Sequence, residues 1–247
     1  YVRNKEKAFE KHDCRSETYN LSANINEKKI LELIDELNND IDVHGILIQL
    51  PLPRNLDSQK ILHFVSPQKD VDGFHPYNLG SLLEGYPDFI PCTPNGILEI
   101  LKYYDIQVAG RYAVIVGRSN IVGKPLFALL SQKFEMGNAT VTICHTRTPD
   151  LSKYTRQADL LIAAAGSPEM IKGDMVKDGV DIIDVGINRV NDDSEKGYHL
   201  VGDVYTESVK GIANSVTPVP GGVGPMTITM LLNNTVIAAE KCRHLEV

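Results

Sequence analysis

Four short apolar segments in the second half of the chain constrain its fold more than any other feature. They are Tyr112–Val116, Thr140–Cys144, Leu160–Ala164 and Asp181–Val185, and helical or loop segments separate them. Short, nearly continuous apolar runs that alternate with helices are typical of parallel strands, which are buried on both faces. The sequence therefore predicts an α/β protein with a parallel sheet.

The first of these strands runs directly into a glycine turn, Gly117-Arg-Ser-Asn-Ile-Val-Gly123, and an apolar helix from Leu126 to Leu130 follows. Free backbone N–H groups at such a helix N-terminus favour a phosphate group. Ser119 replaces the middle glycine of the common G-x-G-x-x-G pattern, and the last glycine comes one residue late. An ordinary tight turn is the alternative, but the strand–turn–helix context favours a Rossmann-like cofactor domain.

The end of the second strand indicates which cofactor would bind. A unit that binds NAD usually carries Asp or Glu about 20 residues beyond the glycines, whereas this chain has Cys144-His-Thr-Arg-Thr148 there. Arg118 and Arg147 suit a 2′-phosphate, which a carboxylate would repel. The sequence favours NADP, and the alternative is that both arginines are merely solvated.

The first hundred residues mix helix and strand patterns. Asn26 is expected to cap a helix, a strand is expected at Gly45–Leu50, and a second helix is expected from about Asp57 to Val65. Thr93 followed by Pro94 predicts the start of a helix that ends near Tyr104.

A Pro/Gly-rich break, Thr217–Pro225, precedes one long helix predicted at residues 226–243 and expected to return to the first domain. We expect a smaller α/β catalytic domain at residues 1–102, completed by 225–247, and a cofactor domain at 103–224, with a cleft between them. The chain opens as a helix without an initiator Met or a cap, so we expect a leading segment to be absent.

Composition excludes several classes of function. The net charge of −7 includes no basic excess, so nucleic acid is not expected as the primary ligand. No apolar run approaches the roughly 20 residues that cross a bilayer. The four cysteines are scattered without a Cys-x-x-Cys pair, so neither a disulfide nor a metal site is predicted. A reducing compartment such as the cytoplasm fits best.

Three polar positions in the first domain are candidates for chemistry. Tyr1 and Lys5 lie four apart on a helix and share one face, Gln49 interrupts an apolar run, and Asp72 lies in the loop Lys69–Gly73. Each has a simpler explanation: surface residues, a local hydrogen bond or a turn. Tyr-x-x-x-Lys also occurs in short-chain dehydrogenases, but there it follows the cofactor turn, which disfavours that family here.

These segments together resemble one family, the bifunctional methylenetetrahydrofolate dehydrogenase/methenyltetrahydrofolate cyclohydrolases. The resembling stretches are residues 1–8, 43–52, 69–73, 91–94, 117–123, 184–188, 202–204 and 217–227. They cover essentially the whole chain in the family's order. The departures are the absent leading segment and Thr146, which stands where many members carry a serine near the 2′-phosphate.

The resemblance implies NADP-dependent oxidation of 5,10-methylenetetrahydrofolate and hydrolysis of the product to 10-formyltetrahydrofolate, in a protein that is usually a homodimer. It implies that Lys5 transfers protons, Gln49 holds Lys5, Asp72 binds the pterin and Tyr1 stacks on the substrate. The implied substrate-binding residues are Tyr1, Lys5, Ile48, Gln49, Leu50, Asp72, Pro220, Gly221, Gly222, Gly224 and Pro225. The implied cofactor-binding residues are Gly117, Arg118, Ser119, Val122, Gly123, Thr146, Arg147 and Ile187.

Three alternatives stay open at this point. The nearest is a dehydrogenase without the second activity, which uses NAD. The others are an unrelated NADP-dependent dehydrogenase of amino or hydroxy acids, and a non-catalytic relative that binds folate or nucleotide.

Overall fold

The computed structural model of the protein describes residues 2–244, and the chain forms two compact units. Unit 1 comprises Tyr1–Cys92 with Ile228–Val247, and unit 2 comprises Thr93–Thr227. The functional domain boundaries expected from the sequence, after residues 102 and 224, stay a prediction. No helix among residues 2–244 combines the length and apolar character that a membrane span requires.

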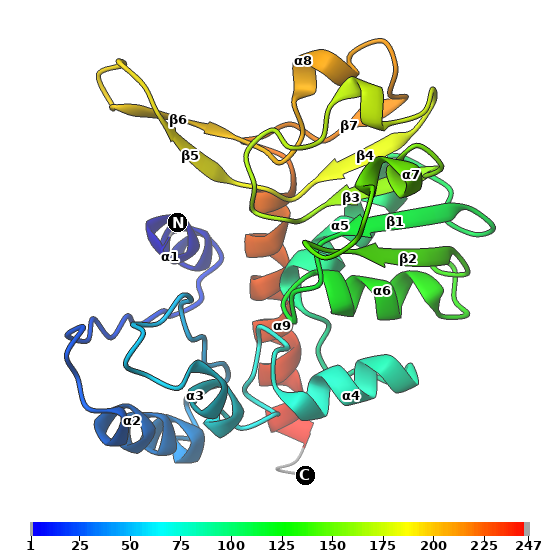
Figure 1. Ribbon diagram of the computed structural model, residues 1–247. Helices are drawn as coiled ribbons and strands as arrows, with labels where there is room; N and C mark the ends of the chain where they lie inside the picture. Colours follow the sequence, from blue (N-terminus) through cyan, green and yellow to red (C-terminus); the bar gives the residue numbers. More distant parts are fainter. Residues whose placement is uncertain (1, 245–247) are drawn as a thin grey trace. The chain divides into compact units, whose positions relative to one another are not determined.

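Unit 2 contains a five-stranded parallel sheet, in which the strands lie in the order β2-β1-β3-β4-β7 (Figure 1). The strands are β1 Tyr112–Val116, β2 Thr140–Cys144, β3 Leu160–Ala163, β4 Asp181–Asp184 and β7 Ser215–Val216. The prediction of an α/β fold with a parallel sheet is confirmed. All four predicted strands are present, and β3 and β4 each end one residue earlier than expected.

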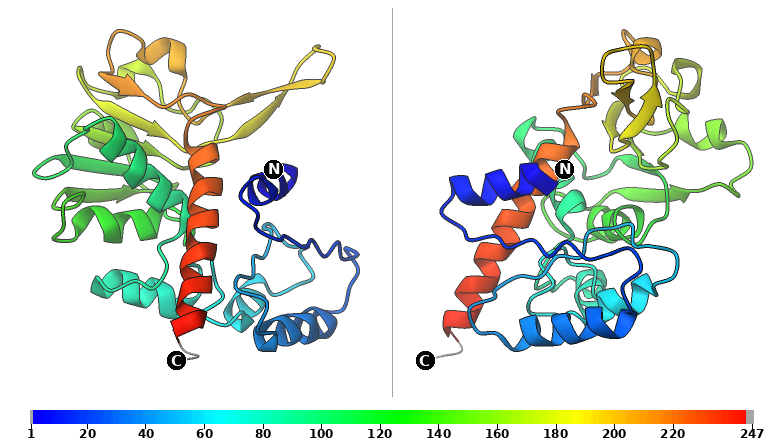
Figure 2. Two further views of the ribbon diagram at one scale, coloured as in Figure 1. Left: turned by 180° about the vertical axis from the view of Figure 1, so that it is seen from behind. Right: turned by 90° about the vertical axis from the view of Figure 1, so that its left-hand side faces the viewer.

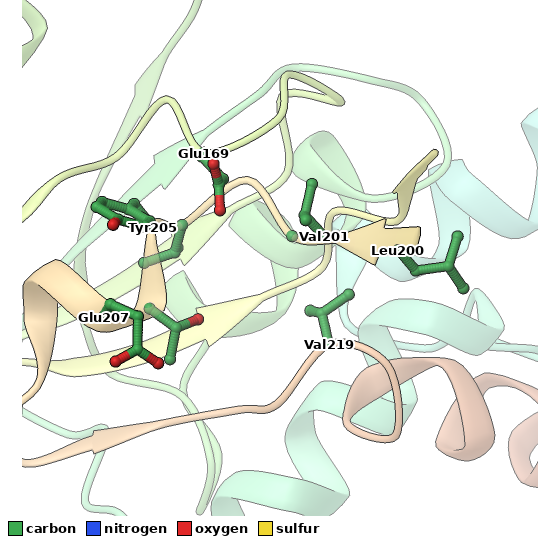
Figure 3. Close-up of a pocket in the computed structure, with 9 residues that line it drawn as sticks. Glu169, Leu200, Val201, Tyr205, Glu207 and Val219 are labelled. Carbon is green, nitrogen blue, oxygen red and sulfur yellow. The ribbon is translucent and has the colours of Figure 1, made fainter. Parts of the chain in front are cut away.

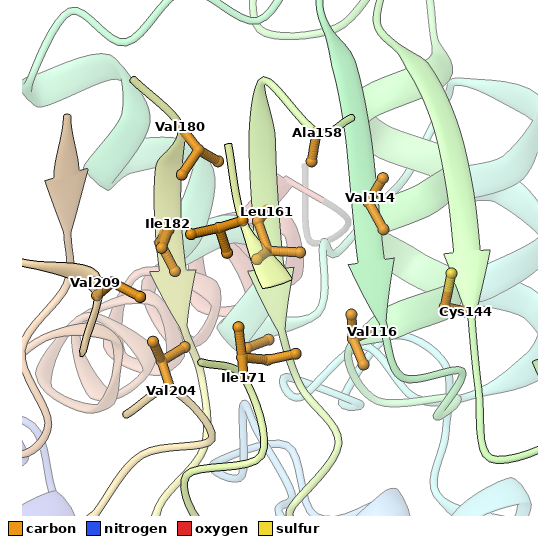
Figure 4. Close-up of a cluster of buried hydrophobic side chains, with 12 residues drawn as sticks. Val114, Val116, Cys144, Ala158, Leu161, Ile171, Val180, Ile182, Val204 and Val209 are labelled. Atoms are coloured by element: carbon orange, nitrogen blue, oxygen red, sulfur yellow. The ribbon is translucent and has the colours of Figure 1, made fainter. Parts of the chain in front are cut away.

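Both faces of this sheet are buried, which explains the continuous apolar runs. Val114 and Val116 of β1, Leu161 of β3 and Ile182 of β4 point into one cluster (Figure 4). Their neighbours along the strands point to the opposite face because successive side chains alternate, and Ile115 there is also fully buried. The sheet is therefore a rigid base for the loops that leave its carboxyl edge.

The helices of unit 2 are α5 Cys92–Tyr103, α6 Gly123–Ser131, α7 Leu151–Thr155 and α8 Thr206–Val209, with a short 3₁₀ turn at Gly173–Met175. Helix α6 packs beside β1 and β2 (Figure 1). The strands β5 Asn188–Asn191 and β6 Tyr198–Val201 form an antiparallel ribbon that extends away from the sheet (Figure 2). Neither strand of this ribbon was predicted from the sequence.

Unit 1 is built mainly from helices: α1 Val2–Lys11, α2 Glu27–Asn39, α3 Ser58–Phe64, α4 Pro76–Glu84 and most of α9 Val223–His244. The predicted cap is confirmed, because the Asn26 side chain accepts a hydrogen bond from the backbone of Lys28. The helix expected from about Asp57 is present as α3, and the Asp57 side chain caps it by accepting hydrogen bonds from the backbone of Gln59 and Lys60. Apolar residues of α2 and α3 form the core of this unit with Ile46 and Leu56.

The expected return of the last helix to the first domain is also confirmed. Asn234 of α9 donates to the carbonyl oxygens of Val71 at 2.8 Å and Ile90 at 3.0 Å. Asn234 is buried, so these bonds join α9 to two loops of unit 1 in the interior.

Two local predictions are wrong. Gly45–Leu50 is not a strand, because within residues 2–244 its pairing is limited to one isolated bridge between Ile46 and Asp70. Apolar character alone does not make a strand without a neighbouring chain to pair with. The helix predicted from Thr93 to about Tyr104 is present as α5, but it begins at Cys92, so Thr93 lies inside it and does not precede it. The Thr93 hydroxyl is 3.0 Å from that of Thr227.

Candidate active site and cofactor loop

Lys5 and Gln49 are in direct contact in unit 1, although 44 positions separate them in the sequence. The Lys5 Nζ donates to the Gln49 Oε1 at 3.2 Å, and the Gln49 Nε2 donates to the carbonyl oxygen of Leu50 at 3.1 Å. The second bond orients the amide so that its oxygen faces Lys5. Gln49 itself is exposed, so the expectation that it lies in a buried strand is wrong, while the expected bond to Lys5 is present.

Asp72 carries the charge that Lys5 faces. Burial lowers the pKa of Lys5 from its ordinary value, and the Coulombic attraction of Asp72 partly opposes this shift. Burial likewise raises the pKa of Asp72 to about 6, against the opposing charge of Lys5. Each group therefore has both protonation states more nearly accessible at neutral pH than it would have in water, as acid–base chemistry requires.

Hydrogen bonds of the neighbouring residues Lys69 and Asp70 fix the position of the loop that carries Asp72. Lys69 donates to the carbonyl oxygens of Leu37 at 2.9 Å and Asp40 at 2.6 Å, where α2 ends. Asp70 accepts from the backbone of His75 at 2.7 Å, at the start of α4. With these neighbours committed to structural contacts, Asp72 is the loop carboxylate left to face Lys5.

Gly73 closes this loop in a conformation that favours glycine. Its φ is +73°, and a Cβ there would lie 2.9 Å from the backbone nitrogen of Pro91. The glycine therefore lets the loop pass close to the segment that leads into α5.

Cys92 and Asn234 bind the backbone next to Asp72, and neither was predicted as a site residue. The Cys92 thiol donates to the Val71 carbonyl oxygen at 3.3 Å and hydrogen-bonds to Asp72, and burial raises its pKa, so it stays protonated. Asn234 binds the same carbonyl oxygen. Cys92 lies in the stretch 91–94 that resembles the family, and Asn234 lies in no such stretch. Only the contacts of the folded chain reveal what the two side chains bind.

Three further predicted substrate residues belong to unit 1. Ile48 is partly buried and packs on the core formed by α2 and α3, and Leu50 is also partly buried. Tyr1 lies outside the described residues, so its predicted stacking role stays a prediction.

The glycine turn of unit 2 is as tight as its sequence suggested. Gly117 has φ +135°, and a Cβ on it would lie 2.1 Å from the carbonyl oxygen of Ala164. A Cβ on Gly123 would lie 2.1 Å from the carbonyl oxygen of Gly117. Both positions therefore require glycine, which lets the start of α6 approach the end of β1 closely.

Ser119 performs a task that differs from that of a phosphate-binding glycine. Its Oγ accepts hydrogen bonds from the backbone of Val122 at 3.1 Å and Gly123 at 3.4 Å, and so occupies N–H groups at the start of α6. A phosphate at this turn would therefore compete with, or bind beside, the serine hydroxyl.

The predicted cationic residues lie at the same edge of the sheet as the glycine turn. The parallel register pairs Val116 with Cys144, so the loops that begin with Gly117 and His145 leave adjacent strands together. Arg118 and Arg147 are exposed, as is Thr146, and among residues 2–244 neither guanidinium forms a salt bridge. Their placement is compatible with a phosphorylated ribose at this edge.

Ile187, which was predicted to bind the cofactor, lies close to Gly224, which was predicted to bind the substrate, within unit 2. Ile187 follows β4 and is 55% exposed, which is unusual for a large apolar side chain beside a sheet. A Cβ on Gly224 would lie 3.5 Å from the Cδ1 of Ile187. Pro220 and Gly221, which precede Gly224, are exposed, and Pro225 follows it on the surface.

Two buried aspartates, Asp184 and Asp203, lie at the same edge of the sheet. They belong to the stretches 184–188 and 202–204 that resemble the family, but neither was predicted as a site residue. Asp184 and Asp203 are 1% and 0% exposed, and each accepts several backbone hydrogen bonds. Burial raises the pKa of Asp184 to about 6, while the backbone bonds oppose this shift. The sequence did offer one signal: each aspartate stands next to apolar residues, which predicts that a charged side chain is buried there.

A separate hollow of about 150 Å³ lies on unit 2. Glu169, Tyr205 and Glu207 project around it, with Val219 at its border (Figure 3). Ligand sites usually enclose about 300 to 1,000 Å³, so this hollow is too small for a dinucleotide. None of the residues predicted as site residues lines it.

Known proteins share this architecture and these motifs. Residues 91–243 match the model of the tetrahydrofolate dehydrogenase/cyclohydrolase NAD(P)-binding domain, and residues 1–72 match the model of the catalytic domain. The bifunctional protein FolD of Chlorobium limicola is 53% identical over 249 residues, which cover 100% of this chain and 84% of that protein.

Solved structures agree with this assignment. The bifunctional FolD of Campylobacter jejuni is 51% identical with a TM-score of 0.91, over 98% of this chain and 83% of that one. The Trypanosoma brucei enzyme, solved with NADP and an inhibitor, is 37% identical with a TM-score of 0.92, over 98% of this chain and 82% of that one. From the family models and the identity along its whole length, the chain belongs to the tetrahydrofolate dehydrogenase/cyclohydrolase family.

Proposed function

We propose that this protein oxidises 5,10-methylenetetrahydrofolate to 5,10-methenyltetrahydrofolate with NADP⁺ and then hydrolyses the product to 10-formyltetrahydrofolate. The observation that carries the proposal is the half-buried Lys5 amine, which is bound to Gln49, faces the Asp72 carboxylate and has a lowered pKa. Family membership supports both activities, because the related proteins are named as bifunctional enzymes.

The two steps balance in atoms and electrons. A hydride leaves the methylene carbon between the two folate nitrogens, which leaves a methenyl cation. Water then adds to this carbon and loses a proton, and one carbon–nitrogen bond breaks to give the formyl product. The hydrolytic step needs a base for the proton of water and an acid for the departing nitrogen.

Lys5 is suited to move these protons. An ordinary lysine with a pKa of about 10.4 is almost wholly protonated at neutral pH and cannot accept a proton. Burial shifts the Lys5 pKa toward neutrality, and a cationic substrate beside the amine would shift it in the same direction. Gln49 fixes the position of the amine through its oxygen, whereas the lowered pKa comes from burial.

Asp72 is suited to bind the pterin. With a pKa of about 6, its carboxyl is mostly ionised at neutral pH and accepts hydrogen bonds from ring N–H and amino groups. The contacts of Lys69 and Asp70 hold this carboxylate in a fixed place.

The residues at the carboxyl edge of the unit 2 sheet fit NADP. A bound nicotinamide would supply the hydride acceptor. The turn between Gly117 and Gly123 would hold the pyrophosphate beside the Ser119 hydroxyl, and Arg118, Thr146 and Arg147 would hold the 2′-phosphate. The exposed Ile187 side chain would cover one face of the nicotinamide.

Comparing the two cofactors tests NADP against the alternative of a monofunctional, NAD-dependent enzyme. Methenyl formation and decay are followed by absorbance with each cofactor in turn. We expect faster turnover with NADP⁺ and decay of the methenyl signal to the formyl product. Persistence of the signal at the rate of uncatalysed hydrolysis would support a dehydrogenase alone.

Lys5→Met tests the role of the amine. We expect the hydrolysis of supplied methenyltetrahydrofolate to fall by about 10²–10⁴, the usual contribution of a general base. Lys7→Met is the matched control, because Lys7 lies on the same helix and is exposed. Full retention of hydrolysis in Lys5→Met would refute the proposed role.

We also propose that the protein is a homodimer, as its family resemblance implies, and that it is located in the cytoplasm, as its scattered cysteines favour. Light scattering on the eluting peak of a size-exclusion column checks the first proposal, and a mass near 27 kDa would contradict it.

A further inference from the structure

Asp203 is a fully buried carboxylate that has no part in the proposed chemistry. Its Oδ2 accepts from the backbone of Ala165 at 2.6 Å and Gly166 at 2.9 Å. Its Oδ1 accepts from the backbone of Ser167 at 2.9 Å and from the side-chain amide of Asn188 at 2.8 Å. One carboxylate thus collects four donors.

These donors belong to two segments that follow neighbouring strands. Ala165–Ser167 form the loop after β3, Asn188 begins β5 just after β4, and the parallel register pairs Ala163 with Asp184 at the ends of β3 and β4. Asp203 therefore ties these two segments together at the carboxyl edge of the sheet. In open parallel sheets this edge is where ligands bind.

The same loops form the surroundings of the predicted dinucleotide contacts. Ala164, directly before the tethered segment, donates to the Val116 carbonyl oxygen at 2.8 Å, and its own carbonyl oxygen faces Gly117. Asn188 directly follows the exposed Ile187. Asp203 thus sets the position of both neighbours without reaching the surface itself.

A second carboxylate holds Asp203 in place. Asp184 accepts from the backbone of Asp203 and of Val204, both at 2.9 Å, and from that of Gly186 at 3.0 Å. Neither aspartate forms a salt bridge with a lysine or arginine in the part of the chain that the structure describes. Their negative charges are compensated by N–H groups alone.

Burial of two carboxylates costs free energy of folding unless hydrogen bonds compensate their charges. The packing also requires glycine nearby: a Cβ on Gly186 would lie 2.3 Å from the Asp203 Oδ1, and one on Gly202 would lie 1.8 Å from the Asp184 Oδ2. In return, the hydrogen bonds of the two carboxylates fix the positions of the segments that they bind.

We propose that Asp203 is a positioning residue for the dinucleotide, which acts by holding Ala164–Ser167 against the glycine turn and Asn188 beside Ile187. The inference rests on the proposed function, since it takes the ligand of this edge to be NADP. Loss of the tether should displace both contacts and weaken dinucleotide binding more than it weakens the fold.

Asp203→Asn tests the inference, with Asp181→Asn as the matched control. Asp181 is also buried and lies at the opposite end of β4, where it accepts hydrogen bonds from Arg111, Asn214 and Ser215. Calorimetric titration with NADP⁺ gives the Kd of each variant. We expect the Kd to rise at least about tenfold in Asp203→Asn and to stay within about twofold in Asp181→Asn, although both lower the unfolding midpoint.

Hydrolysis of supplied methenyltetrahydrofolate without cofactor provides a second readout. Its KM and kcat should stay within about twofold of the parent values in Asp203→Asn, because Lys5 and Asp72 belong to unit 1. If Asp203→Asn does not fold, Asn188→Ala removes one of the four bonds and should still raise the Kd for NADP⁺ several-fold.

The outcomes separate the two proposals. An unchanged Kd in Asp203→Asn or in Asn188→Ala, or an equal rise in Asp181→Asn, overturns the positioning role while NADP⁺ binding by the parent stands. Failure of the unsubstituted protein to bind NADP⁺ overturns the proposed cofactor, and the positioning role with it.

Discussion

Replacement of Gly117 by alanine tests the packing of the cofactor loop most directly. The residue lies where β1 ends, at φ +135°, and its Cβ position is 2.1 Å from the carbonyl oxygen of Ala164 and 2.8 Å from the carbonyl carbon. Both atoms are backbone, so no side chain can rotate away. The loop or the end of β3 must move by about 1 Å to restore ordinary contact distances.

The cost follows from the bonds that such a movement stretches. The Gly117 N–H donates to the Cys144 carbonyl oxygen at 2.9 Å, and the Ala164 N–H donates to that of Val116 at 2.8 Å. Leaving a buried group unpaired costs about 1–3 kcal/mol, and a residue in a sparsely populated backbone region costs about 1–3 kcal/mol. The unfolding free energy should therefore fall by roughly 3 to 9 kcal/mol, against a usual total of about 5 to 15 kcal/mol.

Gly179→Ala is the control, because Gly179 also belongs to unit 2 and has φ +75°, but a Cβ there meets no atom within 4 Å. Its cost should be about 1–2 kcal/mol, that of the left-handed conformation alone. Urea unfolding followed by circular dichroism measures both variants, and titration with NADP⁺ measures the loop. Equal destabilisation of the two variants, or NADP⁺ binding unchanged in Gly117→Ala, would refute the steric reasoning.

Three further predictions concern protons and hydrogen bonds. Gln49→Leu should slow hydrolysis of methenyltetrahydrofolate about fivefold to tenfold, because one hydrogen bond to Lys5 contributes about 1 kcal/mol; an unchanged kcat would contradict this. Because the Asp72 pKa is about 6, the KM for methylenetetrahydrofolate should rise about tenfold between pH 7 and 5. Asp72→Asn should show a high KM without this pH dependence, and a flat profile in the parent protein would count against the role. The pKa of Asp184 is raised from 3.8 to about 6. Between pH 3.8 and pH 6, the Asp184 carboxyl therefore keeps its proton in the folded chain but has lost it in the unfolded chain. The unfolding free energy of the parent relative to Asp184→Asn should therefore fall by about 2.4 kcal/mol as pH rises from 4 to 7. Urea unfolding across this pH range checks it, and a constant difference would show that the Asp184 pKa is not raised.

Features that depend on neighbours in the sequence could be predicted without the structure. The strands β1, β2, β3 and β4 were predictable because strands buried on both faces need continuous apolar residues. The cap at Asn26 was predictable because its side chain binds an N–H group only two residues away. The glycine turn at Gly117 was recognisable because it directly follows a strand and opens a helix.

The candidate site was predictable in part, and by a different route. Lys5, Gln49 and Asp72 were each identified as candidate polar positions, but their roles in one shared site came from the resemblance to a family. No periodicity in the sequence places residues 44 and 67 positions apart side by side. Their spacing in the sequence carries no information about their contact. The failure of Gly45–Leu50 to form a strand has the same cause, because a strand requires hydrogen-bonding partners that its own sequence does not specify.

Tertiary structure alone decided where the buried polar groups find their partners. Asp203 meets donors 36 to 38 residues away, and Asn234 binds a carbonyl oxygen 163 residues away. The sequence determined that such groups needed partners, because a buried polar group without one is costly. Which loops they join depends on the order of the strands and the return of α9, and those are properties of the folded chain as a whole.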